Sequence, residues 1–244
     1  MTPDEQTKWL EWVLITSIPL KQLGSNDSPI GIASGCLVNY RGRRFILTVA
    51  HAVKLGSSDW VIQIGDDKEY GTAIYRPACF LYLSEMKRGT GEISNIDYTY
   101  AEVATDLNPT FQHLTPLGPK SEKRCRHIFD LAAVSDPDTK EIYAFSGEIL
   151  PEMHGSLALV TQQTVYPGLR YIKSDGSFYQ FKLPVPHPGH DLFQGCSGAP
   201  IVDTNGRLVA LVSKGDISEN VIYGIALPRY TSALDFYCNE IRPD

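Results

Sequence analysis

The sequence lacks an excess of basic residues and any long apolar run, and each absence excludes a class of partner. Its 244 residues carry 22 Lys and Arg against 28 Asp and Glu, so a net charge of −6 offers nothing to neutralise nucleic acid phosphates. The longest apolar run near the start covers only residues 12–15, far short of the ~20 residues that a membrane span requires. We therefore expect neither a nucleic acid partner nor a membrane partner.

Cysteine pairs and a basic N-terminal leader are also missing. The five cysteines are scattered, and no two have Cys-x-x-Cys spacing, so neither a disulfide framework nor a structural metal site is indicated. Residues 1–6 are acidic where a secretion signal would be basic. We expect a cytoplasmic protein with reduced thiols and no bound metal.

The residues that are present are typical of a folded, strand-rich protein. Hydrophobic residues make up 43% of the chain and charged residues 20%, which excludes a disordered acidic or basic chain. Short β-rich runs recur at intervals of about 8–12 residues, a pattern that favours an all-β barrel or sandwich over alternating βαβ units. Arg41-Gly42 and Asn205-Gly206 are the clearest hairpin signals between these runs.

The pattern divides the chain into three parts. Residues 1–27 form an N-terminal extension, in which Thr2-Pro3-Asp4-Glu5 predicts a capped helix that reaches about Leu14. Residues 28–120 form a first strand-rich half, whose last part is a proline-rich, exposed connection. Residues 121–244 form the second half, and apolar residues at helical spacing predict a helix at its end.

One glycine-flanked serine could act as a nucleophile. The segment 195–200 reads Gly-Cys-Ser-Gly-Ala-Pro, and its glycines let the backbone bend so that two N–H groups point at one spot. A serine hydroxyl needs such donors, because its attack on a carbonyl creates an oxyanion. Gly195 and Ser197 would supply these N–H groups. The alternative is an ordinary Gly/Ser turn that leads into the next strand.

Two further residues could activate this serine. His51 directly follows a strongly apolar strand, which would hold the imidazole rigidly at the strand end. Asp97 stands at the mouth of an alternating strand, where its carboxylate can accept a bond from a histidine and fix the tautomer. Taken alone, each residue has a plainer interpretation: a hydrogen-bonded histidine of the core or surface, and an aspartate that caps a strand.

Together the three segments identify a family. They stand in the order His51, Asp97, Ser197, and they read Leu-Thr-Val-Ala-His at 47–51, Asp-Tyr-Thr-Tyr-Ala at 97–101 and Gly-Cys-Ser-Gly-Ala-Pro at 195–200. They resemble the three motifs of the trypsin-like (chymotrypsin-fold) serine peptidases, in their intracellular bacterial-type branch. The resemblance implies an all-β fold of two packed six-stranded β-barrels, here with an extra N-terminal helix and a C-terminal helix. The catalytic groups would lie in the cleft between the barrels.

The resemblance implies a serine endopeptidase that hydrolyses peptide bonds through an acyl-enzyme. Ser197 would attack the scissile carbonyl, His51 would transfer the proton and Asp97 would orient His51. The amides of Gly195 and Ser197 would form the oxyanion hole. The substrate would be a polypeptide, and no cofactor is implied.

One departure from the family concerns activation. Secreted members carry an aspartate before the nucleophile, which pairs with the new amino terminus after zymogen cleavage, whereas this chain has Cys196 there. The departure disfavours zymogen activation. An intracellular protease needs some gate, so we expect a regulatory protein partner. A thiol in this position could also be a redox switch or a competing nucleophile.

Two other functions are compatible with parts of the pattern. The first is a catalytically silent trypsin-like module that binds peptides or acts as a scaffold. The second is an esterase-like hydrolase with a Gly-x-Ser-x-Gly turn, but the last glycine of that motif is replaced here by Ala199. Enzymes of that type also have the serine ahead of the histidine, the reverse of the order in this chain.

The resemblance also implies a pocket for the residue before the scissile bond. Asp191 precedes Ser197 by 197 − 191 = 6 positions, as does the pocket-floor aspartate of the trypsin branch, while Ser213, Gly215 and Gly224 match its walls. An acidic floor would favour Arg or Lys, because a cation relieves the cost of a buried carboxylate. The alternative is that Asp191 is a solvated loop residue and that the pocket is shallow and apolar.

Overall fold

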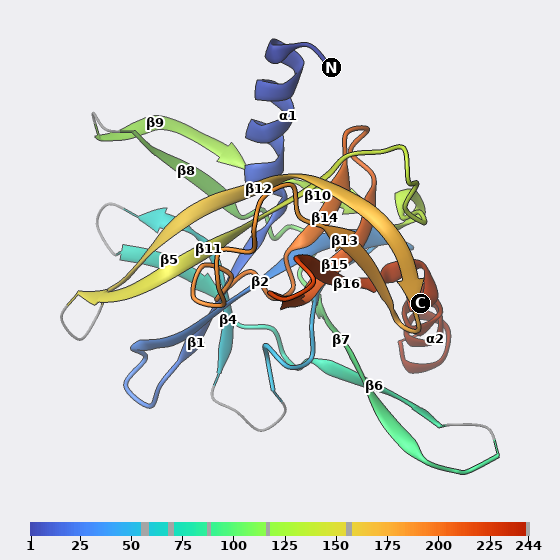
Figure 1. Ribbon diagram of the computed structural model, residues 1–244. Coiled ribbons are helices and arrows are strands. Elements are labelled where there is room, and N and C mark those ends of the chain that lie inside the picture. Colours follow the sequence, from blue (N-terminus) through green and yellow to red (C-terminus); the bar gives the residue numbers. More distant parts are fainter. Residues whose placement is uncertain (55–58, 68–70, 87–88, 116–117, 155–157, 243–244) are drawn as a thin grey trace.

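The computed structural model describes every residue except 55–58, 68–70, 87–88, 116–117, 155–157 and 243–244, and it consists mainly of strands (Figure 1). In chain order its helices and strands are α1 (Pro3–Thr16), β1 (Ile18–Leu23), β2 (Pro29–Tyr40), β3 (Arg43–Thr48), β4 (Trp60–Asp67), β5 (Gly71–Tyr75), β6 (Leu81–Met86), β7 (Ile93–Val103), β8 (Thr110–Thr115), β9 (Gly118–Cys125), β10 (Ile128–Asp130), β11 (Tyr143–His154), β12 (Ala158–Asp175), β13 (Phe178–Lys182), β14 (Pro200–Asp203), β15 (Leu208–Asp216), β16 (Val221–Ala226) and α2 (Thr231–Phe236). Among the described residues, no helix is long and apolar enough to cross a membrane.

The strands form the two halves of a trypsin-like double barrel, which confirms the predicted fold class. In the C-terminal half, six strands close into a barrel in the order β11-β12-β13-β16-β15-β14. The N-terminal half is larger than the six strands expected: its sheet follows the order β5-β4-β1-β2-β3-β7-β6, and β10 pairs with β2 in parallel. The additional pairing comes from segments outside the predicted first half.

The segment 1–27 contains a strand in addition to the helix that the sequence indicated. Its helix begins as predicted, because the side chain of Thr2 accepts from the N–H of Glu5 while the Glu5 carboxylate accepts from the N–H of Thr2. After α1, however, β1 pairs with both β2 and β4, with Leu20 opposite Ala33 and Ile62. The first sheet therefore starts ahead of the predicted boundary at residue 27.

The proline-rich connection also contains secondary structure. β8 and β9 form a two-stranded sheet, and β10 then returns to the first sheet beside β2. The segment between the halves is therefore a hairpin followed by a strand of the first sheet, rather than an irregular linker. The pairing of β10 crosses the predicted boundary at residue 120.

The hairpins and the C-terminal helix agree with the local signals. Arg41 and Gly42 both have positive φ (48° and 74°), as the tight turn between β2 and β3 requires. Asn205-Gly206 joins β14 to β15, and Gly206 has a φ of 81°. At the C-terminus, α2 continues into a π-helical turn, Tyr237–Ile241.

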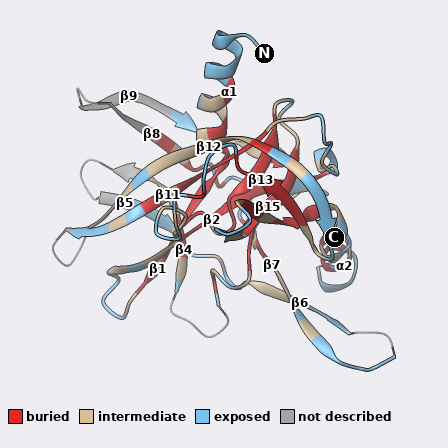
Figure 2. Cartoon of the chain, viewed as in Figure 1, coloured by how far each residue is buried: buried red, intermediate tan, exposed pale blue. Residues whose placement is uncertain are grey.

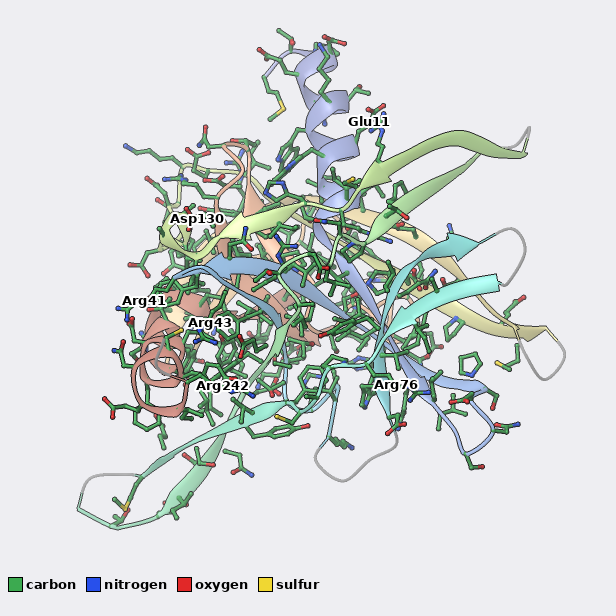
Figure 3. All side chains as sticks on the ribbon, turned by 180° about the vertical axis from the view of Figure 1, so that it is seen from behind. Glu11, Arg41, Arg43, Arg76, Asp130 and Arg242 are labelled. Carbon is green, nitrogen blue, oxygen red and sulfur yellow. The ribbon has the colours of Figure 1, made fainter. Side chains whose placement is uncertain are left out.

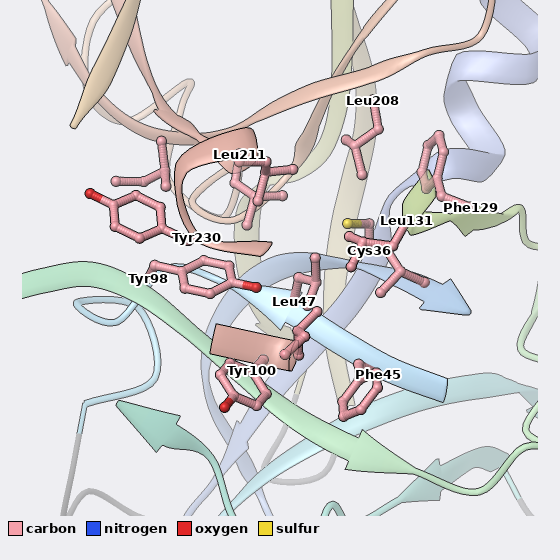
Figure 4. Close-up of a cluster of buried hydrophobic side chains, with 14 of the residues drawn as sticks. Cys36, Phe45, Leu47, Tyr98, Tyr100, Phe129, Leu131, Leu208, Leu211 and Tyr230 are labelled. Atoms are coloured by element: carbon pink, nitrogen blue, oxygen red, sulfur yellow. The ribbon is translucent and has the colours of Figure 1, made fainter. Parts of the chain in front are cut away.

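One large hydrophobic core joins the two halves (Figure 4). Leu47 and Tyr98 of the first half pack in the same cluster as Leu208 and Leu211 of the second. The rings of Tyr98 and Tyr230 stack with their centroids 5.6 Å apart, which ties β7 to the segment before α2. Figure 2 shows these strands buried at the centre of the molecule. The shared core fixes how the two halves meet, and it thereby positions the site between them.

Candidate active site

The structure brings the three predicted residues into one hydrogen-bonded chain. His51 lies just beyond β3, Asp97 lies on β7 of the same sheet, and Ser197 comes from the loop before β14 of the barrel. The Nδ1 atom of His51 is 2.9 Å and 3.0 Å from the two carboxylate oxygens of Asp97. Its Nε2 atom is 3.0 Å from the hydroxyl of Ser197. A proton on Nδ1 therefore leaves Nε2 free to accept the serine proton.

Three donors surround the carboxylate of Asp97. Besides the imidazole, the backbone N–H of His51 donates to Oδ1 (2.9 Å) and the hydroxyl of Ser213 donates to Oδ2 (2.6 Å). Burial opposes the charged form, but the hydrogen bonds from His51 and Ser213 prevail and hold the pKa of Asp97 below its usual value. Asp97 is therefore an ionised, oriented partner for the imidazole.

Glycines shape the loop that carries Ser197. Gly195 has a φ of 94°, and a Cβ atom there would lie 2.2 Å from the carbonyl oxygen of Glu148. Gly198 has a φ of 87°, and its Cβ position lies 2.0 Å from the carbonyl oxygen of Ser34. Both sites need a residue without a side chain, for the backbone angle and for the space. The glycines that the sequence singled out are thus required by the turn itself.

The same loop leaves two backbone donors unused. Ser34 donates to two carbonyl groups of this loop. The Ser34 N–H donates to the carbonyl oxygen of Ser197 and the Ser34 hydroxyl donates to the carbonyl oxygen of Gly195, both at 2.8 Å. In the part of the chain that the structure describes, the N–H groups of Gly195 and Ser197 donate to no protein acceptor. These two groups can therefore bind the oxygen of an incoming carbonyl.

The thiol of Cys196 faces away from this site. It is fully buried against β11, where a Cβ atom on Gly147 would lie 2.6 Å from its sulfur. Burial raises the pKa of Cys196 to about 12, so the thiol stays protonated at neutral pH. Cys196 is therefore poorly suited to be a nucleophile or a redox switch.

A cavity of about 480 Å³ opens beside Ser197. Three of the four predicted pocket residues line it: Asp191, Ser213 and Gly215. Asp191 is exposed, so it lies where solvent reaches the cavity rather than on a buried floor. The cavity provides room for a substrate side chain next to the nucleophile.

Gly224 is not a wall of this cavity, which corrects the fourth prediction. A Cβ atom on Gly224 would lie 2.8 Å from side-chain atoms of Ala210 and Ile201, inside the barrel. The strand pairing explains the difference, because Gly215 stands opposite Ile222 in the ladder between β15 and β16. Ile222 lines the cavity and takes the position that the sequence assigned to a glycine.

Sequence reasoning missed two further features of the site. Ser213 was predicted as a wall residue, but its hydroxyl also binds Asp97. His187 packs behind the cavity, and its Nε2 atom lies 2.4 Å from the Cβ position of Gly215. Only glycine leaves room for this ring. Both contacts join residues far apart in the sequence, Ser213 with Asp97 and His187 with Gly215, so no local signal could predict them. Among the described residues, no group of His, Cys, Asp and Glu side chains could hold a metal ion.

No family model and no curated protein sequence matches this chain. Solved structures do match. A serine endoprotease from Yersinia pestis is 14% identical over 99% of this chain and 70% of its own, with a TM-score of 0.56. The mouse brain serine protease neuropsin is 13% identical over 92% of this chain and 94% of its own, with a TM-score of 0.55. The active form of a protease from M. tuberculosis is 14% identical over 96% and 86% of the two chains, with a TM-score of 0.51.

At these identities the likeness establishes the fold. The chain has the trypsin-like double-barrel fold, which is found in bacterial and mammalian serine proteases alike. A fold does not by itself define a reaction, so the function has to be argued from the site.

Proposed function

We propose that the protein is a serine endopeptidase that hydrolyses polypeptides through an acyl-enzyme. The observation that carries the proposal is the continuous hydrogen-bonded chain from Asp97 through His51 to Ser197, with distances of 2.9–3.0 Å. Such a chain supplies a nucleophile, a base and a group that orients the base. Two unused backbone donors and an adjacent cavity provide for the oxyanion and for the substrate side chain.

The first half-reaction is acylation. The Oγ atom of Ser197 attacks the scissile carbonyl carbon while Nε2 of His51 takes the hydroxyl proton. The N–H groups of Gly195 and Ser197 stabilise the oxyanion of the tetrahedral intermediate. When the peptide bond breaks, His51 returns the proton to the departing amine, and the acyl group stays on Ser197.

The second half-reaction releases the acyl group. His51 takes a proton from a water molecule, whose oxygen attacks the ester carbonyl at the same oxyanion site. The intermediate collapses, the carboxylic product leaves and the proton returns to Ser197. Throughout both steps, the carboxylate of Asp97 stabilises the positive charge that develops on the imidazole.

A catalytically silent peptide-binding module is the alternative with the same fold. The silent module would need no free backbone donors beside Ser197 and no serine within reach of a base. Both features are present, so the geometry favours the enzyme. A cytoplasmic location and a regulatory protein partner remain predictions from the sequence.

Labelling with a fluorophosphonate probe tests the proposal directly. The probe should modify wild-type protein, and mass spectrometry should place the adduct on Ser197. The Ser197→Ala variant should not react, whereas the matched Cys196→Ala variant, changed at the next residue, should react like wild type. If wild type neither reacts with the probe nor cleaves peptides, the silent module is the correct interpretation.

A further inference from the structure

A buried ion pair joins the two halves behind the candidate active site. Lys21 on β1 donates to the carboxylate of Glu148 on β11, and their side chains are only 10% and 13% exposed. The hydroxyl of Thr161 donates to the same oxygen of Glu148 at 2.8 Å. An ion pair with so little solvent access is held in one geometry, because neither charge is stable there alone.

The backbone of Glu148 lies directly against the nucleophile loop. Its carbonyl oxygen is 2.2 Å from the Cβ position of Gly195, and the side chain of Ile32 reaches within 2.4 Å of the same point. Ile32 is in turn the partner of Lys21 in the ladder between β1 and β2. Glu148 thus contacts Gly195 directly through its backbone, and Lys21 is connected to Gly195 through Ile32.

The preceding residue supports the next part of the loop. A Cβ atom on Gly147 would lie 3.0 Å from the Cα atom of Cys196, so the backbones are in close contact there as well. This part of β11 lies at the end of a regular stretch of its ladder with β12: Glu148 is paired with Gln163, and the register shifts between Ile149 and Glu152. Leu150 has a positive φ of 50° within this irregular stretch. The ion pair of Glu148 adds a side-chain anchor just ahead of this irregularity.

We propose that Lys21 and Glu148 are positioning residues of the oxyanion hole. Their ion pair holds residues 147–148 of β11 against the loop, so that the N–H groups of Gly195 and Ser197 point at the substrate oxygen. The inference rests on the proposed function, because only an enzyme uses these donors in a transition state. Neither side chain lines the cavity, so the pair acts on turnover rather than on substrate binding.

Single variants give the first test. Lys21→Met and Glu148→Gln should each lower kcat by about 10-fold to 100-fold, less than the loss of a whole oxyanion donor, while KM stays within about twofold. The pH dependence of kcat/KM should keep its midpoint, since His51 and Asp97 are untouched. A general loss of structure would change KM and the midpoint as well.

The matched control is another ion pair, partly buried and away from the loop that carries Ser197. Arg43 donates to Glu102 at 2.9 Å, beside the C-terminal helix, where Figure 3 shows Arg43 near Arg242. Glu102→Gln should lower the thermal midpoint and leave kcat unchanged. If Glu102→Gln lowers kcat as much as Glu148→Gln does, the effect is one of stability and the inference is wrong.

A double variant keeps the test decisive if the single variants fold poorly. Replacing both charges by apolar chains of similar length, Lys21→Met with Glu148→Met, removes the uncompensated charge and should restore the thermal midpoint. We expect its kcat to stay low, because apolar contacts do not fix the direction of the backbone. A double variant with wild-type kcat overturns the positioning role alone. An inert wild type would instead overturn the proposed function and this inference together.

Discussion

Ser197 and His51 share one proton, so removing either should abolish the same step. Ser197→Ala and His51→Ala should each lower kcat by roughly 10⁴-fold or more, and the double variant should be little worse than either single variant. Steady-state rates on a peptide substrate measure this directly. Losses that multiply in the double variant would mean that the two side chains act independently.

Asp97 should matter through its charge and the tautomer that it selects. Asp97→Asn keeps the size of the side chain but presents an N–H group to the imidazole, so kcat should fall by about 10⁴-fold. The fold should persist, and probe labelling should slow in parallel with peptide hydrolysis. Undiminished activity in Asp97→Asn would remove this residue from the mechanism.

Because the pKa of Asp97 is lowered, the effect of Asp97→Asn on thermal stability should depend on pH. A carboxyl group whose pKa is lower in the folded state stabilises the fold at pH values above its unfolded pKa of about 4, and the contribution disappears as the pH falls through the folded value. The thermal midpoints of wild type and Asp97→Asn should therefore differ most near pH 6–7 and converge below about pH 4. Midpoints that diverge on acidification would contradict the lowered pKa.

Two interpretations of the pocket were open: an acidic floor formed by Asp191, and a shallow, apolar pocket with Asp191 in solvent. The residues that line the cavity favour the second. Ile222 narrows the cavity, while Asp191 is exposed. We expect a preference for small or apolar residues before the scissile bond, and Asp191→Ser should change kcat/KM by no more than about twofold. Ile222→Gly should improve cleavage after Phe relative to Ala by about 10-fold or more. A peptide library measures both, and a preference for Arg that Asp191→Ser abolishes would restore the acidic pocket.

The sequence was informative about individual residues where the chemistry is local. The glycines beside Ser197 could be singled out because bond angles and steric space within one turn require them. Ile222 and Gly224 could not be assigned correctly, since the wall residue is decided by the register between β15 and β16. Because the prediction was displaced by two residues along β16, it named Gly224 as the wall residue, whereas Ile222 is the residue opposite Gly215.

Among the elements, α1 is anchored to the C-terminal barrel by its last turns. The indole N–H of Trp9 donates to the carbonyl of Asp203 at 3.0 Å, and the hydroxyl of Ser146 donates to the carbonyl of Val13 at 2.8 Å. Figure 2 shows the first turns of the helix exposed and the last ones buried. The helix therefore packs on the C-terminal barrel.

Trp9→Ala should destabilise the protein without lowering its kcat. The loss of the buried indole should cost about 3–5 kcal/mol of unfolding free energy, whereas kcat should stay near wild type because no residue of α1 lines the cavity. Denaturant titration gives the free energy. The control is Lys8→Ala, which removes an exposed ion pair with Asp4 on the same helix and should cost at most about 0.5 kcal/mol. A large loss of kcat in Trp9→Ala would show that α1 reaches the site.

Elements defined by local signals were predictable, and those defined by distant partners were not. The capped start of α1 and the two tight hairpins depend on neighbouring residues, and all three occur as expected. β1 was not predicted, and β10 was assigned to the second half, because the place of both strands depends on pairing with β2, which lies elsewhere in the sequence. The pairing of each strand with β2 therefore crosses a predicted boundary.

For the molecule as a whole, the position of the site between two halves depends on their shared core. The largest hydrophobic cluster contains residues of both sheets and of the C-terminal helix (Figure 4). β10 adds a strand from the second half of the chain to the first sheet. Neither half can unfold without exposing apolar surface of the other, so the halves should behave as one cooperative unit.

Calorimetry of two matched core variants tests this cooperativity. Leu47 of the first half and Leu211 of the second are both completely buried in the shared cluster. Each Leu→Ala substitution should cost about 2–5 kcal/mol and lower the same single thermal transition by about 5–15 °C. Activity should disappear within that transition, because His51 and Ser197 separate when the halves part. If Leu47→Ala shifts one transition and Leu211→Ala shifts another, the halves unfold independently and the shared core does not hold the site together.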